Sequence, residues 1–329
     1  MYPAIDERAV REAARVLLAG GLVAIPTETV YGLAADADNR EAVLATFAVK
    51  GRPTNHPLIV HVKSAEALPF WARDIPDAAW LLAKKFWPGP LTMVLPRGER
   101  CGTFVTGGQD TVAIRCPSHP WVQALLSEIS GSTMKGFTAP SCNTFGRISP
   151  TSARHVLADL GVKPEGKLDY VLDGGRCEVG VESTILDLSG DHPQILRHGA
   201  VTRAMLEEAL GVPVPDAGSA APRVPGTLKS HYAPATRLEL VPREEFARRI
   251  GELSGMKLAV MASEELLHGL SGNVVLALTA PAGAAPYASF LYEALHELDQ
   301  AGAERILIEQ PPRDPAWAAV NDRLGRASA

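Results

Sequence analysis

A stretch rich in proline, alanine and glycine, residues 212–236, interrupts the regular patterning of this chain. Its sequence, VPVPDAGSAAPRVPGTLKSHYAPAT, lacks the apolar period of a helix or a strand and indicates a linker with extended, semi-rigid pieces. The chain has 329 residues, which is a little more than two domains of about 150 residues each. We therefore predict two domains, 1–211 and 238–329, joined by a Pro-rich linker over 212–237.

On both sides of this linker, short apolar runs alternate with segments of helical spacing. Before it, strands are predicted at 22–26, 58–62, 91–95, 111–115, 170–172 and 184–188. Helices are predicted there at 6–19, 40–48, 77–86, 151–160 and 202–210. After it, the segments RLELV, KLAVMA, NVVLALT and RILIE are strand-like, and those between them are helix-like. This alternation predicts a small parallel sheet with crossover helices.

Charge and cysteine content argue against several classes of protein. Residues 1–212 hold 21 Lys and Arg against 23 Asp and Glu, so this half lacks the basic surface typical of nucleic-acid binding. The four cysteines show no CxxC spacing, which argues against a disulfide framework or a zinc site and favours a reducing cytosol. No signal peptide is visible, and no apolar run approaches the roughly 18 residues of a membrane span. We expect a cytoplasmic protein without membrane contact.

Two motifs that follow predicted strands carry residues suited to small charged ligands. PTETVYGL places hydroxyls and a carboxylate, including Thr29, at a strand end, where α/β sheets bind ligands. KGRP places Lys50 and Arg52 on a stiff loop, and a point charge beside a planar guanidinium suits polyphosphate. Each motif alone also fits an ordinary turn or a solvated loop. His61 lies in an apolar strand, where histidine is more often a core residue than a ligand.

Further candidates follow along the chain. Arg115 ends a predicted strand, where a guanidinium suits a carboxylate or phosphate. Ser141 and Asn143 offer small polar groups, the segment SPT opens a helix whose N-terminus favours anions, and Ser183 begins a strand. Together the motifs supply cations, hydroxyls and amides without a nucleophile–base pair. That pattern is typical of positioning and charge stabilisation, as in phosphoryl and nucleotidyl transfer.

In this order, six motifs make the chain resemble the threonylcarbamoyl-AMP synthases in their long, two-domain form: PTETVYGL, KGRPTNHPLIVH, TVAIRCPSH, APSCN with SPT, GVESTI and PGTLKSHYAP. The resemblance covers essentially the whole chain. It implies an α/β fold with an N-terminal catalytic domain built on a twisted, open, mixed sheet and a smaller C-terminal Rossmann-like parallel domain. It also implies that L-threonine, bicarbonate and ATP give threonylcarbamoyl-AMP and pyrophosphate, with Mg²⁺. A separate transferase complex would use the product for threonylcarbamoyladenosine in tRNA.

The same resemblance implies roles for individual residues. Threonine would be held by Thr29, His61, Arg115 and Ser183, with Arg115 on its carboxylate. ATP would be held by Lys50, Arg52, His56, Thr111, Ser141, Asn143, Ser149, Arg197 and Tyr232. Lys50 and Arg52 would be catalytic by stabilising charge on the phosphates, and no protein ligand to a metal is predicted. Tyr232 would reach over the nucleotide, which makes the linker a lid.

Three features depart from the family pattern. His56 stands where the family usually has Asn, and Cys142 stands where it usually has Ala; we expect Cys142 to be a small packed residue. The segment SEISGSTMKGFT, residues 127–138, is unusual ahead of APSCN. Two alternatives stay open: an RNA-binding module that uses the concave face of such a domain, and a related enzyme that makes a carbamoyl adenylate from carbamoyl phosphate. Direct contact with tRNA is left open.

Overall fold

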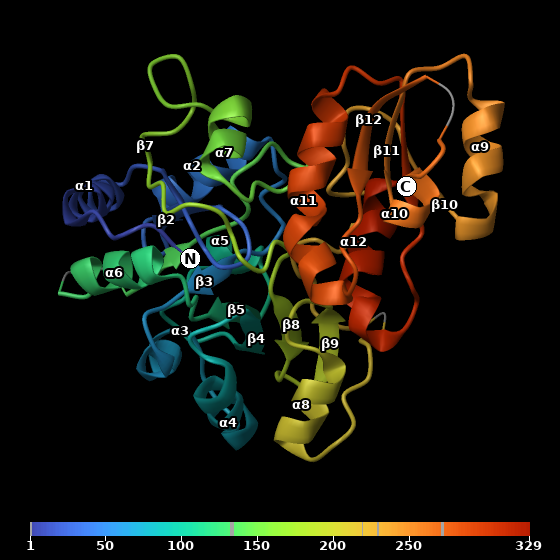
Figure 1. Ribbon diagram of the computed structural model, residues 1–329. Coiled ribbons are helices and arrows are strands. Elements are labelled where there is room, and N and C mark those ends of the chain that lie inside the picture. Colours follow the sequence, from blue (N-terminus) through green and yellow to red (C-terminus); the bar gives the residue numbers. More distant parts are fainter. Residues whose placement is uncertain (1, 132–134, 219, 229, 271–272) are drawn as a thin grey trace. The chain divides into compact units, whose positions relative to one another are not determined.

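The structure is a computed structural model that describes residues 2–131, 135–218, 220–228, 230–270 and 273–329 (Figure 1). Contacts divide the chain into two units. The first unit is Met1–Phe145 with Pro150–Thr227, and the second unit is Gly146–Ser149 with Leu228–Ala329. The predicted linker, residues 212–237, is thus divided between the two units. Residues 132–134, in the segment that departs from the family pattern, lie outside the described residues. The assignment of catalytic, lid and accessory roles to the three predicted parts stays a prediction.

The first unit is built on a nine-stranded mixed sheet in the order β7-β1-β2-β6-β3-β5-β4-β8-β9. Its strands are β1 (Val23–Ile25), β2 (Gly32–Asp36), β3 (Ile59–His61), β4 (Leu91–Pro96), β5 (Thr111–Arg115), β6 (Phe137–Thr138), β7 (Tyr170–Val171), β8 (Thr184–Asp187) and β9 (Gln194–Arg197). The pairs β1/β7, β3/β5 and β4/β8 are parallel, and the others are antiparallel. The predicted mixed-sheet α/β fold is confirmed.

Helices of the first unit pack on this sheet with local signals that the sequence carries. They are α1 (Glu7–Leu18), α2 (Arg40–Lys50), α3 (Leu68–Trp71), α4 (Asp77–Phe86), α5 (Thr103–Thr106), α6 (Pro120–Ile129), α7 (Ala153–Asp159) and α8 (Arg203–Leu210). Asp6 and Asn39 cap α1 and α2 by accepting backbone N–H groups. Gly51 ends α2 in the left-handed conformation, which fixes Lys50 in the last turn.

Apolar residues cover both faces of the central strands. On one face, Met93 and Ile114 pack with Leu82 of α4 and Leu206 of α8 in the largest core cluster. On the other face a small cluster includes Ile59, Val94, Ala113, Ile185 and Val224. Val224 belongs to the part of the linker that lies in the first unit. This part of the linker therefore packs on the sheet face that also carries the polar residues described below.

Apolar patterning did not predict the strands β2, β6 and β9 or the helices α3, α5 and α6. The strand β2, GLAAD, holds no β-branched or aromatic residue, so its intrinsic preference for a strand is weak. Pairing with β1 and β6 on its two sides makes it a strand. This is a tertiary effect that local composition does not reveal.

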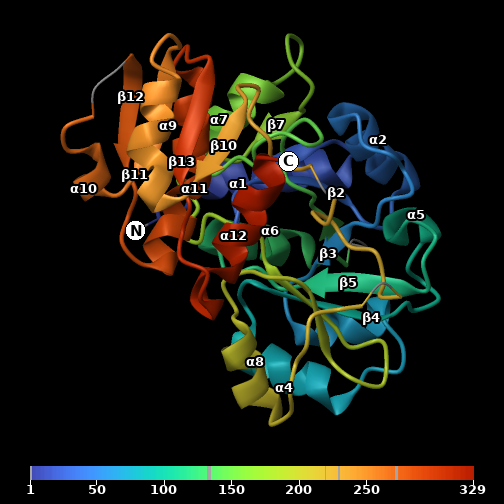
Figure 2. The same cartoon turned by 90° about the vertical axis from the view of Figure 1, so that its right-hand side faces the viewer.

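The second unit is built on four parallel strands in the order β10-β13-β11-β12, which Figure 2 shows side by side. They are β10 (Leu238–Val241), β11 (Leu258–Ala262), β12 (Val274–Thr279) and β13 (Arg305–Glu309), with α9 (Phe246–Glu252), α10 (Glu264–Leu267), α11 (Ala284–Gln300) and α12 (Ala318–Ala327). The predicted smaller parallel α/β domain is confirmed. No helix in the described ranges is long and apolar enough to span a bilayer.

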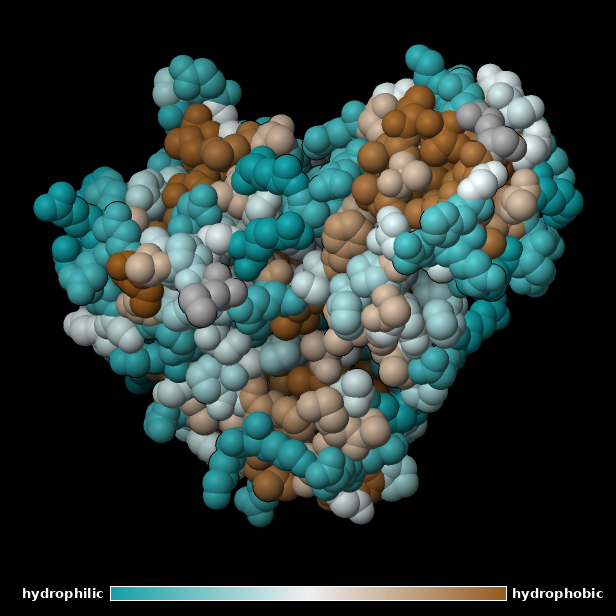
Figure 3. Space-filling model, in the orientation of Figure 1, coloured by the Kyte–Doolittle hydropathy of each residue, from teal (hydrophilic) through white to brown (hydrophobic). Residues whose placement is uncertain are grey.

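Burial follows strand position in this second sheet. The inner strand β11 is buried along its whole length, as expected for a parallel strand covered on both faces. The edge strand β12 alternates between partly buried and exposed residues, and Val275 is 43% exposed. Figure 3 shows hydrophobic surface over this part of the unit.

Candidate active site

A single row of residues crosses five neighbouring strands of the first unit. Strand pairing places His61 opposite Arg115, Arg115 opposite Thr92, Thr92 opposite Ile185, and Ile185 opposite Arg197. Residues directly opposite each other point to the same face of a sheet. The strand register thus brings His61, Arg115 and Arg197, which lie on separate strands, to one face of the sheet.

Arg115 is the centre of a buried polar cluster on this face. Its guanidinium forms an ion pair with Glu28 at 2.7 Å, with both side chains at most 5% exposed. Its Nη1 donates to the Thr29 hydroxyl at 2.9 Å, and Glu28 also accepts the Ser118 N–H at 3.1 Å. Arg115 Nε is buried and has no hydrogen-bond partner among the described residues. A guanidinium with an unused buried donor suits one more anionic oxygen, such as that of a carboxylate.

Hydroxyl groups surround this guanidinium. The Thr29 hydroxyl lies 2.8 Å from that of Thr27, and the Ser183 hydroxyl lies 2.7 Å from that of Thr92. All four side chains are buried. Neither Thr92 nor the ion pair of Glu28 was predicted from the sequence. A buried threonine inside the otherwise apolar run LTMVL is a signal that could have found Thr92.

Arg197 holds Ser183 in place. Its Nε and Nη2 donate to the Ser183 carbonyl oxygen at 3.1 and 2.9 Å, and Nη2 also reaches the Ser183 hydroxyl at 3.2 Å. Its Nη1 donates to the carbonyl oxygen of Pro225, in the linker, at 3.0 Å. Arg197 therefore contacts both Ser183, which is predicted to bind threonine, and Pro225 in the linker. Its predicted contact with ATP stays a prediction.

His61 is a neutral group at the edge of this cluster. It is 2% exposed, its Nδ1 donates to the Ile59 carbonyl oxygen at 3.2 Å, and its ring stacks on Phe137 with 5.9 Å between centroids. Burial, together with the charge of Arg115, lowers its pKa to about 3. His61 therefore offers an uncharged imidazole to a ligand at neutral pH.

A second cluster forms where α2 ends. Lys50 is 2% exposed, and its Nζ donates to the carbonyl oxygens of Ser141 and Asn143, each at 2.5 Å. Arg52 is 9% exposed and donates from Nη2 to the Pro57 carbonyl oxygen at 2.9 Å. Burial and then the charge of Arg52 lower the pKa of Lys50 to about 7. The structure thus brings together four residues predicted to bind ATP, two of them cations.

Two of the remaining residues discussed above, His56 and Cys142, lie near this second cluster, and Thr111 lies on β5. His56 is partly buried, with its ring edge-on to Phe145 at 5.5 Å, and burial, with the charge of Arg52, lowers its pKa. Thr111 begins β5 and is partly exposed. Cys142 is fully buried in an apolar cluster, as expected, and burial raises the pKa of its thiol to about 12. That thiol is therefore a packing group rather than a nucleophile.

Two predicted ATP residues belong to the second unit. Ser149 is fully buried, and its carbonyl oxygen accepts a hydrogen bond from His296 Nε2 at 3.2 Å. Tyr232 is 1% exposed, and its ring lies 5.7 Å from that of Tyr292 and under the guanidinium of Arg323 at 5.4 Å. Both residues are therefore packed within the second unit. Their predicted roles at the nucleotide stay predictions.

A site for Mg²⁺ needs several oxygen ligands close together. In the part of the chain that the structure describes, no three His, Cys, Asp or Glu side chains gather so as to hold a metal ion. The Lys50 ammonium group donates to two carbonyl oxygens and lies near the Arg52 cation, and the carboxylate of Asp159 is close enough to act on its charge. Mg²⁺ is commonly held through substrate phosphates and water. The described residues do not form a protein-built site for it, and no step below depends on it.

Two family models together match nearly the whole chain. Residues 15–199 match the model described as "Telomere recombination", and residues 201–329 match "Threonylcarbamoyl-AMP synthase, C-terminal domain". The chain is 38% identical to the threonylcarbamoyl-AMP synthase of Pyrococcus abyssi, with 98% of this chain and 95% of the relative covered. The chain belongs to the threonylcarbamoyl-AMP synthase family. The predicted resemblance is confirmed, and the chain is an enzyme of a nucleotidyltransferase type.

Other members of this family agree over similar lengths. The threonylcarbamoyl-AMP synthase of Bacillus subtilis is 37% identical, with 97% of this chain and 92% of the relative covered. Among solved structures, that of P. abyssi Sua5 complexed with L-threonine has a TM-score of 0.88 at 36% identity and covers 99% of this chain and 96% of that chain. The similarity extends over both units, which confirms the long, two-domain form.

Proposed function

We propose that this chain makes L-threonylcarbamoyl-AMP and pyrophosphate from L-threonine, bicarbonate and ATP. The product would pass to a separate transferase complex that forms threonylcarbamoyladenosine in tRNA. The names of the family relatives support this reaction, and a solved relative is complexed with L-threonine. A cytosolic site of action is part of the proposal, and the four free, buried cysteines are consistent with it.

The buried cluster around Arg115 is the observation that carries this proposal. A threonine carboxylate would accept from the unused Nε of Arg115, which is already fixed by Glu28 and Thr29. The paired hydroxyls of Ser183 and Thr92 lie in or beside the same row and suit the polar groups of the amino acid. His61 contributes a neutral ring. The site therefore suits a small zwitterion with a hydroxyl group.

Lys50 and Arg52 would hold the phosphates of ATP. Both cations are at most 9% exposed, so their attraction for a phosphate is screened less by water than that of a surface lysine. The carbonyl oxygens of Ser141 and Asn143 accept from Lys50, and His56 lies near the charge of Arg52. Thr111 begins β5, the strand that pairs with β3. Ser149, Arg197 and Tyr232 complete the proposed ATP set. Incoming phosphate oxygens would replace the two carbonyl oxygens that now accept from Lys50.

The proposed chemistry needs positioning and charge stabilisation. The threonine amine adds to bicarbonate with loss of water and forms a carbamate. A carbamate oxygen then attacks the α-phosphorus, the bond to the β-phosphate oxygen breaks, and pyrophosphate leaves. Negative charge increases on the phosphate oxygens in this step, where Lys50 and Arg52 would stabilise it.

The direct test is release of pyrophosphate from ATP by the full chain. We expect release that requires both L-threonine and bicarbonate and falls to background when either is omitted. Release without threonine, or with carbamoyl phosphate in its place, would contradict the proposal and support the carbamoyl-adenylate alternative. Strong, salt-sensitive RNA binding without ATP turnover would support the RNA-binding alternative.

The pH dependence of the reaction should report the charge of Lys50. With its pKa held at about 7 by burial and by Arg52, Lys50 is a cation below that pH and a neutral amine above it. We expect kcat/KM for ATP to fall as the pH rises through about 7, because this ratio reports groups of the free enzyme. In Arg52→Gln one cause of the low pKa is removed, so the fall should move to higher pH. An unchanged midpoint in that variant would contradict this explanation.

A further inference from the structure

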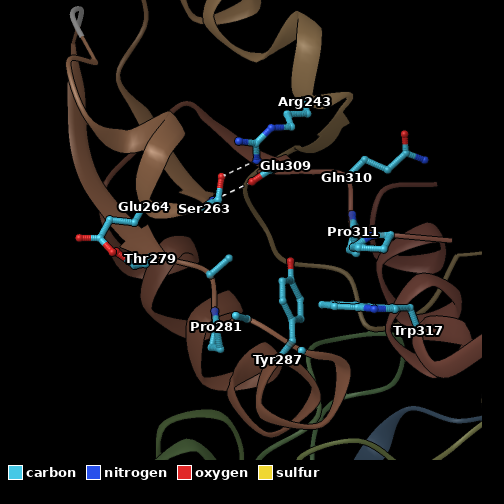
Figure 4. A pocket seen from close by; sticks show the side chains of 14 residues that line it. Arg243, Ser263, Glu264, Thr279, Pro281, Tyr287, Glu309, Gln310, Pro311 and Trp317 are labelled. Atoms are coloured by element: carbon cyan, nitrogen blue, oxygen red, sulfur yellow. Dashed lines mark hydrogen bonds and ion pairs between the residues drawn. The ribbon is translucent and has the colours of Figure 1, made fainter. Parts of the chain in front are cut away.

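A pocket with a volume of about 530 Å³ lies at the carboxyl edge of the parallel sheet in the second unit (Figure 4). Ser263 follows β11, Thr279 ends β12, Glu309 ends β13, and Arg243 lies just after β10. The carboxyl ends of parallel strands are where α/β sheets bind ligands. The volume falls within the range of about 300–1,000 Å³ that is usual for small-molecule sites. The pocket shares no residue with the candidate active site.

The walls of this pocket are mostly apolar and include flat side chains. Pro281, Pro311 and Pro312 line it together with the rings of Tyr287 and Trp317. The two aromatic rings meet edge to face, with 5.4 Å between centroids and 72° between planes. Such rigid aromatic and proline surfaces suit a planar ring better than a flexible chain.

Tyr287 directs a hydroxyl group into this space. Its side chain comes from the first turns of α11, and in Figure 4 the hydroxyl points toward Glu309 and Arg243. Tyr287 is 4% exposed, yet its hydroxyl has no hydrogen-bond partner in the described ranges. Buried polar atoms are normally paired. Burial and the charge of Glu309 raise the pKa of Tyr287, so the group stays a neutral donor. An unused buried donor indicates an acceptor on a bound molecule.

The start of α11 borders the pocket. This helix has 17 residues, and its N-cap is Gly283, which has no side chain to accept the first backbone N–H groups. Gly283 itself lines the pocket. Pro286 has no N–H, and the Tyr287 N–H donates to the Gly283 carbonyl oxygen, so the Tyr287 hydroxyl is a donor that this helix directs toward the pocket.

Carboxylates outnumber cations on the pocket lining. Arg243 is the cation, and it donates to Glu309 at 2.9 Å and to the Ser263 hydroxyl at 3.0 Å. Glu309 also accepts the Ser263 N–H at 2.7 Å, and Glu264 adds a second carboxylate. Outside the lining, Glu265 forms a further ion pair with Arg243. Because the charge of Arg243 is already balanced, the lining favours hydroxyl donors over another anion.

We propose that this pocket binds a neutral nucleoside. Its planar base lies against Trp317 and the prolines and accepts from the Tyr287 hydroxyl. Its sugar hydroxyls donate to the carboxylates of Glu309 or Glu264. The proposal adds a second ligand site to the chain and is independent of the reaction proposed for the first unit.

Calorimetric titration of the full chain with adenosine tests this site. Tyr287→Phe removes only the hydroxyl, and we expect adenosine to bind about three- to tenfold more weakly, as for one lost hydrogen bond. The free variant should unfold at the same or a higher temperature, because it loses an unpaired buried group. Ala282→Phe fills the lining and should abolish binding, whereas the matched control Ala285→Phe lies outside the lining and should leave it unchanged.

Comparison ligands and a variant of the other site complete the test. The binding that Ala282→Phe abolishes should be weaker for AMP and inorganic phosphate than for adenosine, and tighter binding of AMP in this Ala282→Phe-sensitive part would overturn the proposal of a neutral ligand. Arg52→Gln, in the candidate active site, should leave this binding unchanged even if it abolishes pyrophosphate release. Absence of adenosine binding, or equal binding by wild type, Tyr287→Phe and Ala282→Phe, would overturn the site.

Discussion

Replacing Lys50 with methionine is expected to lower kcat for pyrophosphate release by about 10²–10³-fold, the usual loss when one stabilising group at a developing charge is removed. Methionine keeps the length of the side chain and removes its charge. Lys50 is 2% exposed and Arg52 is the cation beside it, so the variant loses one of the two buried charges at the proposed phosphate site. The measurement is steady-state pyrophosphate release with saturating threonine, bicarbonate and ATP.

Folding must be checked in the same variant. Lys50→Met leaves the carbonyl oxygens of Ser141 and Asn143 without this donor, so some loss of stability is expected, on the order of 1–3 kcal/mol per group. Circular dichroism and thermal unfolding would report it. The matched control is Lys84→Met, which removes an exposed lysine from α4 and should change neither property. Near-normal turnover of a folded Lys50→Met protein would rule out the proposed role.

Arg115→Gln is expected to lower the free energy of unfolding by about 3–5 kcal/mol and to raise KM for threonine strongly. The loss of stability follows because the substitution leaves the Glu28 carboxylate buried without its ion-pair partner. The loss of affinity follows because the guanidinium is the proposed partner of the threonine carboxylate. Denaturant unfolding measures the first effect, and threonine-dependent pyrophosphate release measures the second.

The double variant Glu28→Gln with Arg115→Gln separates these two effects. It removes both buried charges, so most of the lost stability should return, whereas the affinity for threonine should stay low. Arg11→Gln is the control: it breaks an exposed ion pair with Glu7 and should cost at most about 1 kcal/mol. Recovery of a normal KM for threonine in the double variant would contradict the role of Arg115.

Much of the fold could be predicted from apolar periodicity. The predicted strand at 111–115 and helix at 77–86 agree with the observed β5 and α4, and the parallel sheet after the linker is confirmed. Local pattern was insufficient for β2 and β9. The strand β2 lacks strong strand formers, and β9 is a four-residue strand at the edge of the sheet that pairs with β8.

The pocket beside Tyr287 shows a second limit of sequence analysis. Its residues follow four different strands, so they are scattered over about seventy positions without a common motif. Whether the hydroxyl of a tyrosine is paired depends on atoms contributed by other elements. The unpaired hydroxyl of Tyr287 therefore could not be predicted from the sequence.

By itself the sequence determined which chemical groups this chain can use and, through six ordered motifs, the family to which it belongs. Only the tertiary structure decided how those groups combine. The register of five strands aligns His61, Arg115 and Arg197 on one face, although β3 and β9 lie more than a hundred residues apart in the chain. Burial and proximity then set the charge of Lys50 and His61. The physical reason is that strand register and desolvation arise from contacts between segments distant in sequence, which local patterns do not encode.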